Sequence, residues 1–161
     1  MYKILIVWAL SQETNVIKEE IKKLELMNFK TSYLTTGMWN YNMILNLTRF
    51  LENHDFDLVL NIWVCWYVIE KQDFLQIARI YNLSNNKELI IPQIINFWIS
   101  QSIACSESAV YDEKNIWEEI YVDMESYGFE KVCDSFFIPR IILKIPVDKI
   151  WKETKNFDFE K

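Results

Sequence analysis

Buried strands that alternate with amphipathic helices constrain the fold of this chain more than any other feature of its sequence. Residues 2–8 (YKILIVW) form an aliphatic and β-branched run without polar alternation, which is typical of a strand buried on both faces. Residues 12–26 then place apolar side chains at helical spacing among Lys and Glu. A strand at 31–36, a helix at 41–52 and a buried strand at 57–65 continue the pattern. The alternation predicts an α/β fold, a three-layer sandwich around a mostly parallel, mixed central sheet.

The second half of the chain contains the same kinds of element. We expect strands at 74–80, 103–106 and 120–123, a helix at 124–135 and a final strand at 138–147. No internal repeat and no linker divides these segments. The sequence therefore predicts a single domain over residues 1–161.

The charge balance and the apolar pattern exclude two classes of partner. With 17 Lys and Arg against 23 Asp and Glu, the net charge is −6, which repels a phosphate backbone, so we expect no nucleic acid partner. The longest apolar stretch, residues 4–10, is far shorter than the roughly 20 residues that span a bilayer. The residues that follow it do not form a signal-peptide cleavage site. We therefore expect a cytoplasmic protein without a membrane partner.

The cysteines give no sign of a metal site or a disulfide framework. Cys65, Cys105 and Cys133 are odd in number and widely spaced, so they are interpreted as small buried hydrophobic residues. We expect neither a metal nor another cofactor.

Polar residues follow several of the predicted strands, and ligands of open α/β sheets bind outside the carboxyl ends of strands. These residues are Ser11 to Glu13, Thr35 to Asn40, Asn61 to Tyr67, Ser106 to Ser108, Asp123 to Glu125, and Asp148. Three acids, Glu13, Glu125 and Asp148, should converge on one edge of the sheet. Each could instead cap the helix that follows it. Convergence of all three favours a functional site.

Four segments resemble, in matching order, segments of one enzyme superfamily. Residues 4–13 (ILIVWALSQE) look like a strand that enters a Gly-Ala turn and ends on a catalytic glutamate, and residues 35–52 (TTGMWNYNMILNLTRFLE) like a Ser/Thr-Gly-Ile-Gly turn with its helix. Residues 57–67 (DLVLNIWVCWY) resemble an Asn-x-Gly-x-Ala-Gly strand end. Residues 122–148 contain VDMES and IPRIILKIPVD, similar to a Val-Glu-Met-Glu signature and a strand that ends on a catalytic aspartate. The chain thus resembles the purine nucleoside phosphorylase superfamily, and most of all the 5′-methylthioadenosine/S-adenosylhomocysteine nucleosidases.

The resemblance implies two catalytic acids for cleavage of an N-glycosidic bond. Glu13 matches the acid that orients or activates the attacking water, and Asp148 matches the acid that protonates or hydrogen-bonds nitrogen 7 of the purine. The reaction passes through an oxocarbenium-like sugar, so a carboxylate near the anomeric carbon and an acid at the leaving base lower the barrier from both sides. Burial would raise the pKa of Asp148 enough for it to donate a proton.

The resemblance also implies a set of substrate-binding residues. Met124 and Glu125 match the residues that hold the ribose, and Val110 and Tyr111 fall where main chain and an aromatic ring hold the base. Gly37 lies in the matching turn. The ligand implied is a small purine nucleoside, and the assembly implied is a homodimer whose partner helps to close the 5′ side of the site.

The nucleophile and the extent of the domain are less clear from the residues. The first loop, residues 9–13, lacks the arginine with which phosphorylases hold phosphate, which favours water. Phosphate stays open as a co-substrate because Arg49, Arg79 or Arg140 could reach the site. The chain is shorter than typical members, with the deficit expected between about residues 67 and 94. Lys144 stands where the nucleosidases have an arginine.

Trp8, Trp39, Trp63 and Trp66 fall where the resembled motifs have glycine. Such turns need glycine because the backbone takes a positive φ or approaches the ligand, and an indole obstructs both. The chain has 2 Gly and 7 Trp, against an expected glycine content of about 11 residues at average usage. We hypothesise that these tryptophans are glycine in the natural protein, inserted at a reassigned UGA codon. The alternative is a diverged relative that has lost its activity and only binds a nucleoside.

The codons decide between these alternatives. If the hypothesis is right, the coding DNA has UGA at all seven tryptophan positions, and mass spectrometry of the natural protein finds glycine there. Seven UGG codons would refute it.

Overall fold

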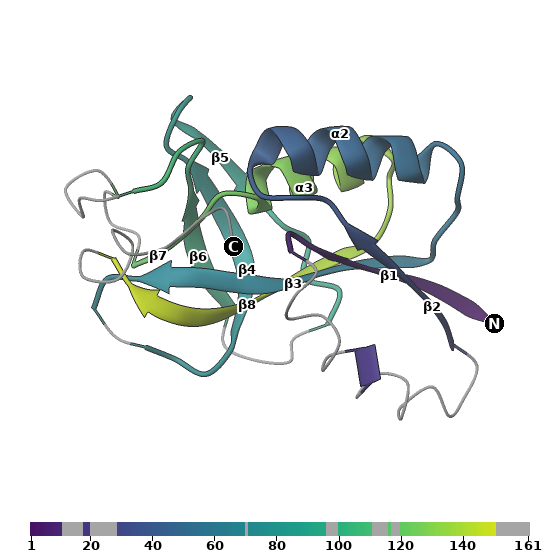
Figure 1. The fold of residues 1–161 in the computed structure, drawn as a ribbon, viewed down its shortest axis with the longest axis horizontal. Coiled ribbons are helices and arrows are strands. Elements are labelled where there is room, and N and C mark those ends of the chain that lie inside the picture. The colour runs from purple at the N-terminus through teal and green to yellow at the C-terminus, as the bar shows by residue number, and fades with distance from the viewer. Residues whose placement is uncertain are drawn as a thin grey trace.

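The computed structural model describes residues 1–10, 18–19, 29–69, 71–95, 100–110, 116 and 120–150 (Figure 1). The elements in chain order are β1 (Tyr2–Trp8), β2 (Phe29–Thr35), α2 (Asn40–Leu51), β3 (Leu58–Tyr67), β4 (Leu75–Asn82), β5 (Lys87–Ile90), β6 (Ser100–Cys105), β7 (Tyr121–Asp123), α3 (Ser126–Ser135) and β8 (Arg140–Lys149). Residues 18 and 19 are helical, and the rest of the helix predicted for 12–26 lies outside the described residues. Neither described helix is both long and apolar enough to cross a bilayer.

The strands form one mixed sheet that is mostly parallel. β1 pairs in parallel with β2 and β3, β3 with β8, and β6 with β4 and β7. The antiparallel pairs are β3 with β7, β4 with β5, and β4 with β8. Five strands therefore pair in a closed ring, β3–β8–β4–β6–β7, while β1 and β2 extend the sheet to one side. The predicted α/β class with a mixed sheet is confirmed.

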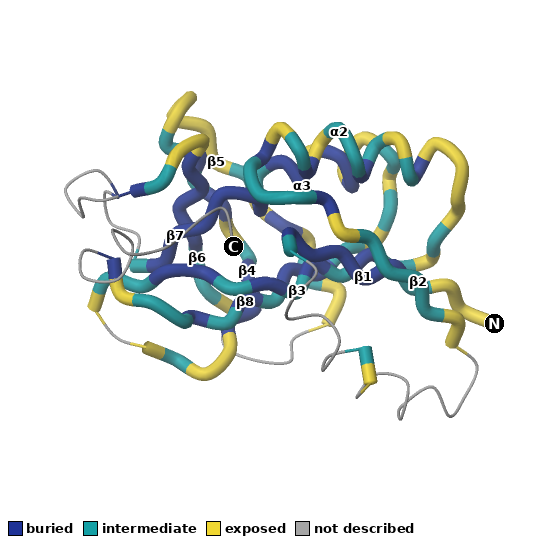
Figure 2. Tube along the Cα trace, in the orientation of Figure 1, coloured by how far each residue is buried: buried dark blue, intermediate teal, exposed yellow. Residues whose placement is uncertain are grey.

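Helices α2 and α3 pack side by side over one face of this sheet (Figure 1). Leu47 of α2 and Phe129 of α3 join Val7 and Val59 of the sheet in one core cluster, and all four side chains are fully buried. Figure 2 shows the inner strands buried and the outward turns of α2 exposed. Apolar residues spaced along each helix thus explain why the two helices dock on the β1–β3 face.

The two helices approach closely at Gly128. A Cβ on this residue would lie 2.8 Å from the backbone oxygen of Asn40, which is closer than real Cβ atoms come to a neighbour. The Gly128 N–H donates to Asn40 Oδ1 at 2.6 Å. The contact joins the first turn of α2 to α3 and fixes both beside the carboxyl edge of the sheet.

Most strands occur where the sequence predicts them, but their ends differ. β3 and β8 each continue two residues beyond the predicted end, so that Trp66, Tyr67 and Asp148 belong to strands. β5 was not predicted, because its four residues KELI are largely exposed and lack a buried face. It pairs with β4 at the edge of the sheet.

One of the four motif tryptophans, Trp39, lies on backbone that suits glycine. Trp39, at the N-cap of α2, has φ 80° and ψ 145°, close to a region that is essentially restricted to glycine. Trp66 does not have a positive φ, and at the register shift beside it the extra residue, Val147, is on β8. Trp8 is accommodated differently: its ring stacks on Tyr33 at 5.5 Å and its Nε1 donates to Thr35 Oγ1.

Exchange of Trp39 for two small residues isolates the backbone contribution. Trp39→Gly and Trp39→Ala both remove the indole, but only alanine keeps a Cβ at positive φ. We expect the glycine variant to be more stable by about 1 to 2 kcal/mol. Urea unfolding of both variants measures the difference, and an alanine variant as stable as the glycine variant would contradict the strain at this residue.

Candidate active site

A cavity of about 220 Å³ opens at the carboxyl ends of β1, β3, β7 and β8. Its lining consists of Leu10, Met38, Trp63, Val64, Cys65, Trp66, Met124, Glu125, Val147 and Asp148. The wall is mostly apolar, and two carboxyl groups reach it. Ligand cavities typically measure about 300 to 1,000 Å³, so this one is small while the indoles of Trp63 and Trp66 form part of its wall.

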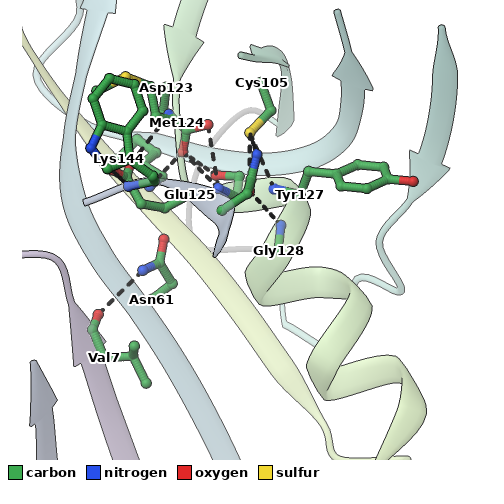
Figure 3. A network of polar contacts seen from close by, with 12 residues as sticks. Val7, Asn61, Cys105, Asp123, Met124, Glu125, Tyr127, Gly128 and Lys144 are labelled. Carbon is green, nitrogen blue, oxygen red and sulfur yellow. Dashed lines mark hydrogen bonds and ion pairs between the residues drawn. The ribbon is translucent and has the colours of Figure 1, made fainter. Parts of the chain in front are cut away.

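Glu125 lies in the turn between β7 and α3 and is 3% exposed. Its Oε1 accepts a hydrogen bond from the Trp39 N–H at 3.2 Å, and its Oε2 accepts one from the Met124 N–H at 3.3 Å (Figure 3). The first of these donors is at the N-terminus of α2, where the helix dipole also favours a negative charge. The carboxylate is therefore fixed between two elements.

The pKa of Glu125 is raised to about 7, first by burial and second by the neighbouring Asp123 carboxylate. The Lys144 ammonium and the two N–H donors act in the opposite direction. Removal from water penalises the charged form of a carboxyl group, which explains the sign. Near neutral pH Glu125 can therefore exist with or without its proton.

A buried ion pair lies beside Glu125. Lys144 Nζ of β8 is 2.7 Å from Asp123 Oδ2 of β7, and the two side chains are 0% and 1% exposed. Asp123 also accepts from the Ser126 N–H at 3.2 Å and from the Ser126 hydroxyl, at the first residue of α3. Burial lowers the pKa of Lys144, but the charges of Asp123 and Glu125 outweigh it, so the net pKa is raised and Lys144 stays charged.

Asn61 of β3 lies between this cluster and β1. Its Nδ2 donates to the Val7 carbonyl at 3.3 Å, and its Oδ1 has no partner among the described residues although the side chain is fully buried. Figure 3 shows the amide on the same side of β3 as Lys144 and Glu125. The amide of Asn61 thus joins β3 to the backbone of β1.

The structure brings Met124, Glu125 and Asp148 to one cavity. Asp148 is half-buried and is paired in register with Trp66 of β3. Because Lys149 still belongs to β8, Asp148 does not cap a helix that begins there.

The other predicted site residues lie beside the cavity or outside the described residues. Val110 packs in one cluster with Met124 and Trp66. Gly37 has φ 84° and donates its N–H to the Ala9 carbonyl at 3.0 Å, which closes the turn that leads to Met38. Glu13 and Tyr111 lie outside the described residues.

The partnership between Asp123 and Lys144 was not predicted from the sequence. A signal was present, because a lysine in the middle of the apolar strand IILKIPV has to be paired if it is buried. The sequence did not show which acid pairs with it. Within the described ranges, no group of three or more His, Cys, Asp or Glu side chains could hold a metal ion.

Solved structures share this fold over nearly the whole chain. No protein-family model and no curated sequence matches it. A putative 5′-methylthioadenosine/S-adenosylhomocysteine nucleosidase from Francisella philomiragia superposes with a TM-score of 0.79 at 15% identity, covering 97% of this chain and 90% of that one. The chain has the nucleosidase fold.

Two ligand-bound nucleosidases show the same similarity. A Helicobacter pylori MTAN mutant with 5′-methylthioadenosine in its active site gives a TM-score of 0.81 at 13% identity, covering 97% of this chain and 89% of that one. The Neisseria meningitidis enzyme in complex with methylthio-immucillin-A gives 0.78 at 11% identity, with 97% and 90% covered. The fold confirms the resemblance to the nucleosidases.

Replacement of Glu125 should change how stability depends on pH. A carboxyl group whose pKa is raised on folding binds more protons in the folded state, so its contribution to stability is lost as the pH rises from about 4.5 to about 7. The free energy of unfolding of Glu125→Gln, relative to that of the wild type, should therefore increase by about 2 to 3 kcal/mol between pH 5 and pH 8. Urea unfolding across this range measures the difference.

The matched control is Glu52→Gln, at an exposed glutamate that follows α2. Its unfolding free energy should stay parallel to that of the wild type at every pH. A Glu125→Gln curve that also stays parallel would show that Glu125 does not retain its proton in the folded protein.

Proposed function

We propose that this protein cleaves the N-glycosidic bond of a purine nucleoside by hydrolysis, with a substrate of the methylthioadenosine or adenosylhomocysteine type. The observation that supports this most is the meeting of Glu125 and Asp148 at one apolar cavity, on the sheet edge where the fold binds ligands. The fold shared with the nucleosidases supports the same reaction.

The roles follow from the positions of the groups. Glu125, held by two N–H donors, accepts hydrogen bonds from the ribose hydroxyls, and the buried Met124 packs against the sugar. Asp148 of β8 donates a hydrogen bond or a proton to nitrogen 7 of the purine. Glu13 activates the water. Acid catalysis at the leaving base is typically worth about 10² to 10⁴ in rate.

Water, rather than phosphate, is the nucleophile in this proposal. The described lining of the cavity contains no arginine. Arg140 is paired with Glu130 and Asp134, and Arg79 with Glu88. Arg49 is in the last turn of α2, at the end away from the cavity. The three arginines that left phosphorolysis open therefore lie elsewhere.

The tryptophans support a second candidate for the chain as printed, a nucleoside-binding domain without turnover. Trp63 and Trp66 line the cavity, and Trp39 supplies the N–H that holds Glu125. Chromatography of the bases released from methylthioadenosine, adenosine and inosine, with and without phosphate, separates the candidates. Base released without phosphate indicates hydrolysis, and ribose 1-phosphate formed only with phosphate indicates phosphorolysis.

The same assay should compare the chain that has tryptophan at positions 8, 39, 63 and 66 with a chain that has glycine at these positions. Binding without turnover in both would favour the binding domain. A homodimer and a cytoplasmic location remain expectations of the proposal, and equilibrium sedimentation at assay concentration tests the first.

Asp148→Asn tests the acid in the glycine-restored chain. The amide still donates a hydrogen bond but delivers no proton, so we expect kcat to fall by at least about 10² with a much smaller change in KM. Steady-state kinetics with methylthioadenosine measures both constants. The matched control is Asp134→Asn, an exposed acid on α3, which should leave kcat unchanged. Near-normal turnover in Asp148→Asn would leave Glu13 as the main acid.

A further inference from the structure

We propose that Lys144 is a positioning residue for ribose binding: through its buried ion pair with Asp123 it fixes the turn that carries Glu125 and sets the charge that Glu125 presents to the cavity. The inference rests on the proposed role of Glu125 as the ribose acceptor. It gives a role to Lys144 and Asp123, which do not contact the substrate in the proposed mechanism.

Lys144 is connected to Glu125 through Asp123 and through the turn that Asp123 and Ser126 hold. Lys144 Nζ holds the Asp123 carboxylate at 2.7 Å, and that carboxylate holds the N–H and the hydroxyl of Ser126. Met124 and Glu125 lie between these two anchored residues. The turn is therefore clamped at both ends, and the Met124 N–H and the Trp39 N–H orient the carboxyl group that it carries.

The charges of the cluster do not balance. Asp123 and Glu125 are both buried acids, and Lys144 is the buried cation that both contact electrostatically. The direct ion pair is with Asp123, so one negative charge is left over when Glu125 is ionised. A proton on Glu125 relieves this surplus in the free protein. Hydroxyl donors of a ribose relieve it in the complex, and binding should therefore release a proton near neutral pH.

Other ionisable groups face the same region from the neighbouring elements. Cys65 of β3 and Asp148 of β8 line the cavity with Glu125. Cys105 ends β6, and burial raises the pKa of both cysteine thiols, so they stay neutral. Glu107 accepts hydrogen bonds from Asn40 and Asn82. Asp148 is a second carboxyl group at the cavity, so a pH profile of activity alone cannot isolate Glu125.

Carbon-13 NMR of protein labelled at the glutamate carboxyl groups isolates the titration of Glu125. The Glu125 signal is assigned by its loss in Glu125→Gln, and its titration midpoint is expected near 7 in the wild type. Lys144→Met should move the midpoint up by about 1 pH unit or more, and Asp123→Asn should move it down by a similar amount. Lys144→Arg, which keeps the charge, should restore the wild-type midpoint.

Arg140→Met is the matched control. This cation is also on β8 and also pairs with a buried acid, Glu130 of α3, but it does not line the cavity. Its loss should lower stability and leave the Glu125 midpoint unchanged. If Lys144→Met does not fold, Asp123→Asn alone decides, because its amide oxygen can still accept from the Ser126 N–H. Midpoints that do not move, or that move in the same direction in both variants, would overturn the proposal.

Kinetics separates this inference from the proposed function. In Lys144→Met, the KM for methylthioadenosine at pH 7 should rise about tenfold, with kcat at saturation changed much less, and the KM should recover at higher pH. Unchanged KM with shifted midpoints would show that the charge of Glu125 is not used for ribose binding, which overturns that part of the proposal. Absence of turnover at every pH, both with tryptophan and with glycine at positions 8, 39, 63 and 66, would refute the proposed function, while the NMR titration still decides whether Lys144 controls Glu125.

Discussion

The ion pair between Lys144 and Asp123 joins the middle of β8 to the carboxyl end of β7, and both strands pair with β3. Removing one partner from a buried pair typically costs about 3 to 5 kcal/mol, because the other charge is left in a medium of low polarity. The pair is completed by Ser126 at the start of α3, so the same carboxylate that neutralises the lysine also anchors a helix. The contact therefore links β8 to the end of β7 and, through the turn that carries Glu125, to the start of α3.

The backbone around the cavity explains why glycine would be expected there. Trp39 holds a positive φ so that its N–H can point at Glu125, and a side chain at this conformation is strained. Gly37 reaches the same kind of conformation without that cost. The tryptophan positions therefore differ in character: Trp8 has partners for its ring and its nitrogen, whereas at Trp39 the backbone itself favours a residue without a Cβ.

Much of the fold could be predicted from the sequence, because buried strands and amphipathic helices leave a strong periodic signal. β1 and α2 were predicted almost to the residue, since their apolar residues either run without interruption or recur at helical spacing. The closed ring of strands could not be predicted, because antiparallel pairing of β4 with β8 joins segments that are distant in the chain. Glu125 and Asp148 were found through their places after or at strand ends. Asp123 and Asn61 were named only as members of polar runs, since their importance depends on partners that the sequence does not specify.

Closure of the ring has a consequence for how copies of this chain could associate through their backbones. In the described part of the chain, the path of paired strands ends at β2 and β5, so these are its edge strands. Both edges contain exposed charged residues, Lys30 on β2 and Lys87 with Glu88 on β5. Charged side chains on an edge strand disfavour the addition of another strand. The strands that build the cavity, β3, β7 and β8, are internal to the sheet, so growth at either edge would leave their hydrogen bonds intact.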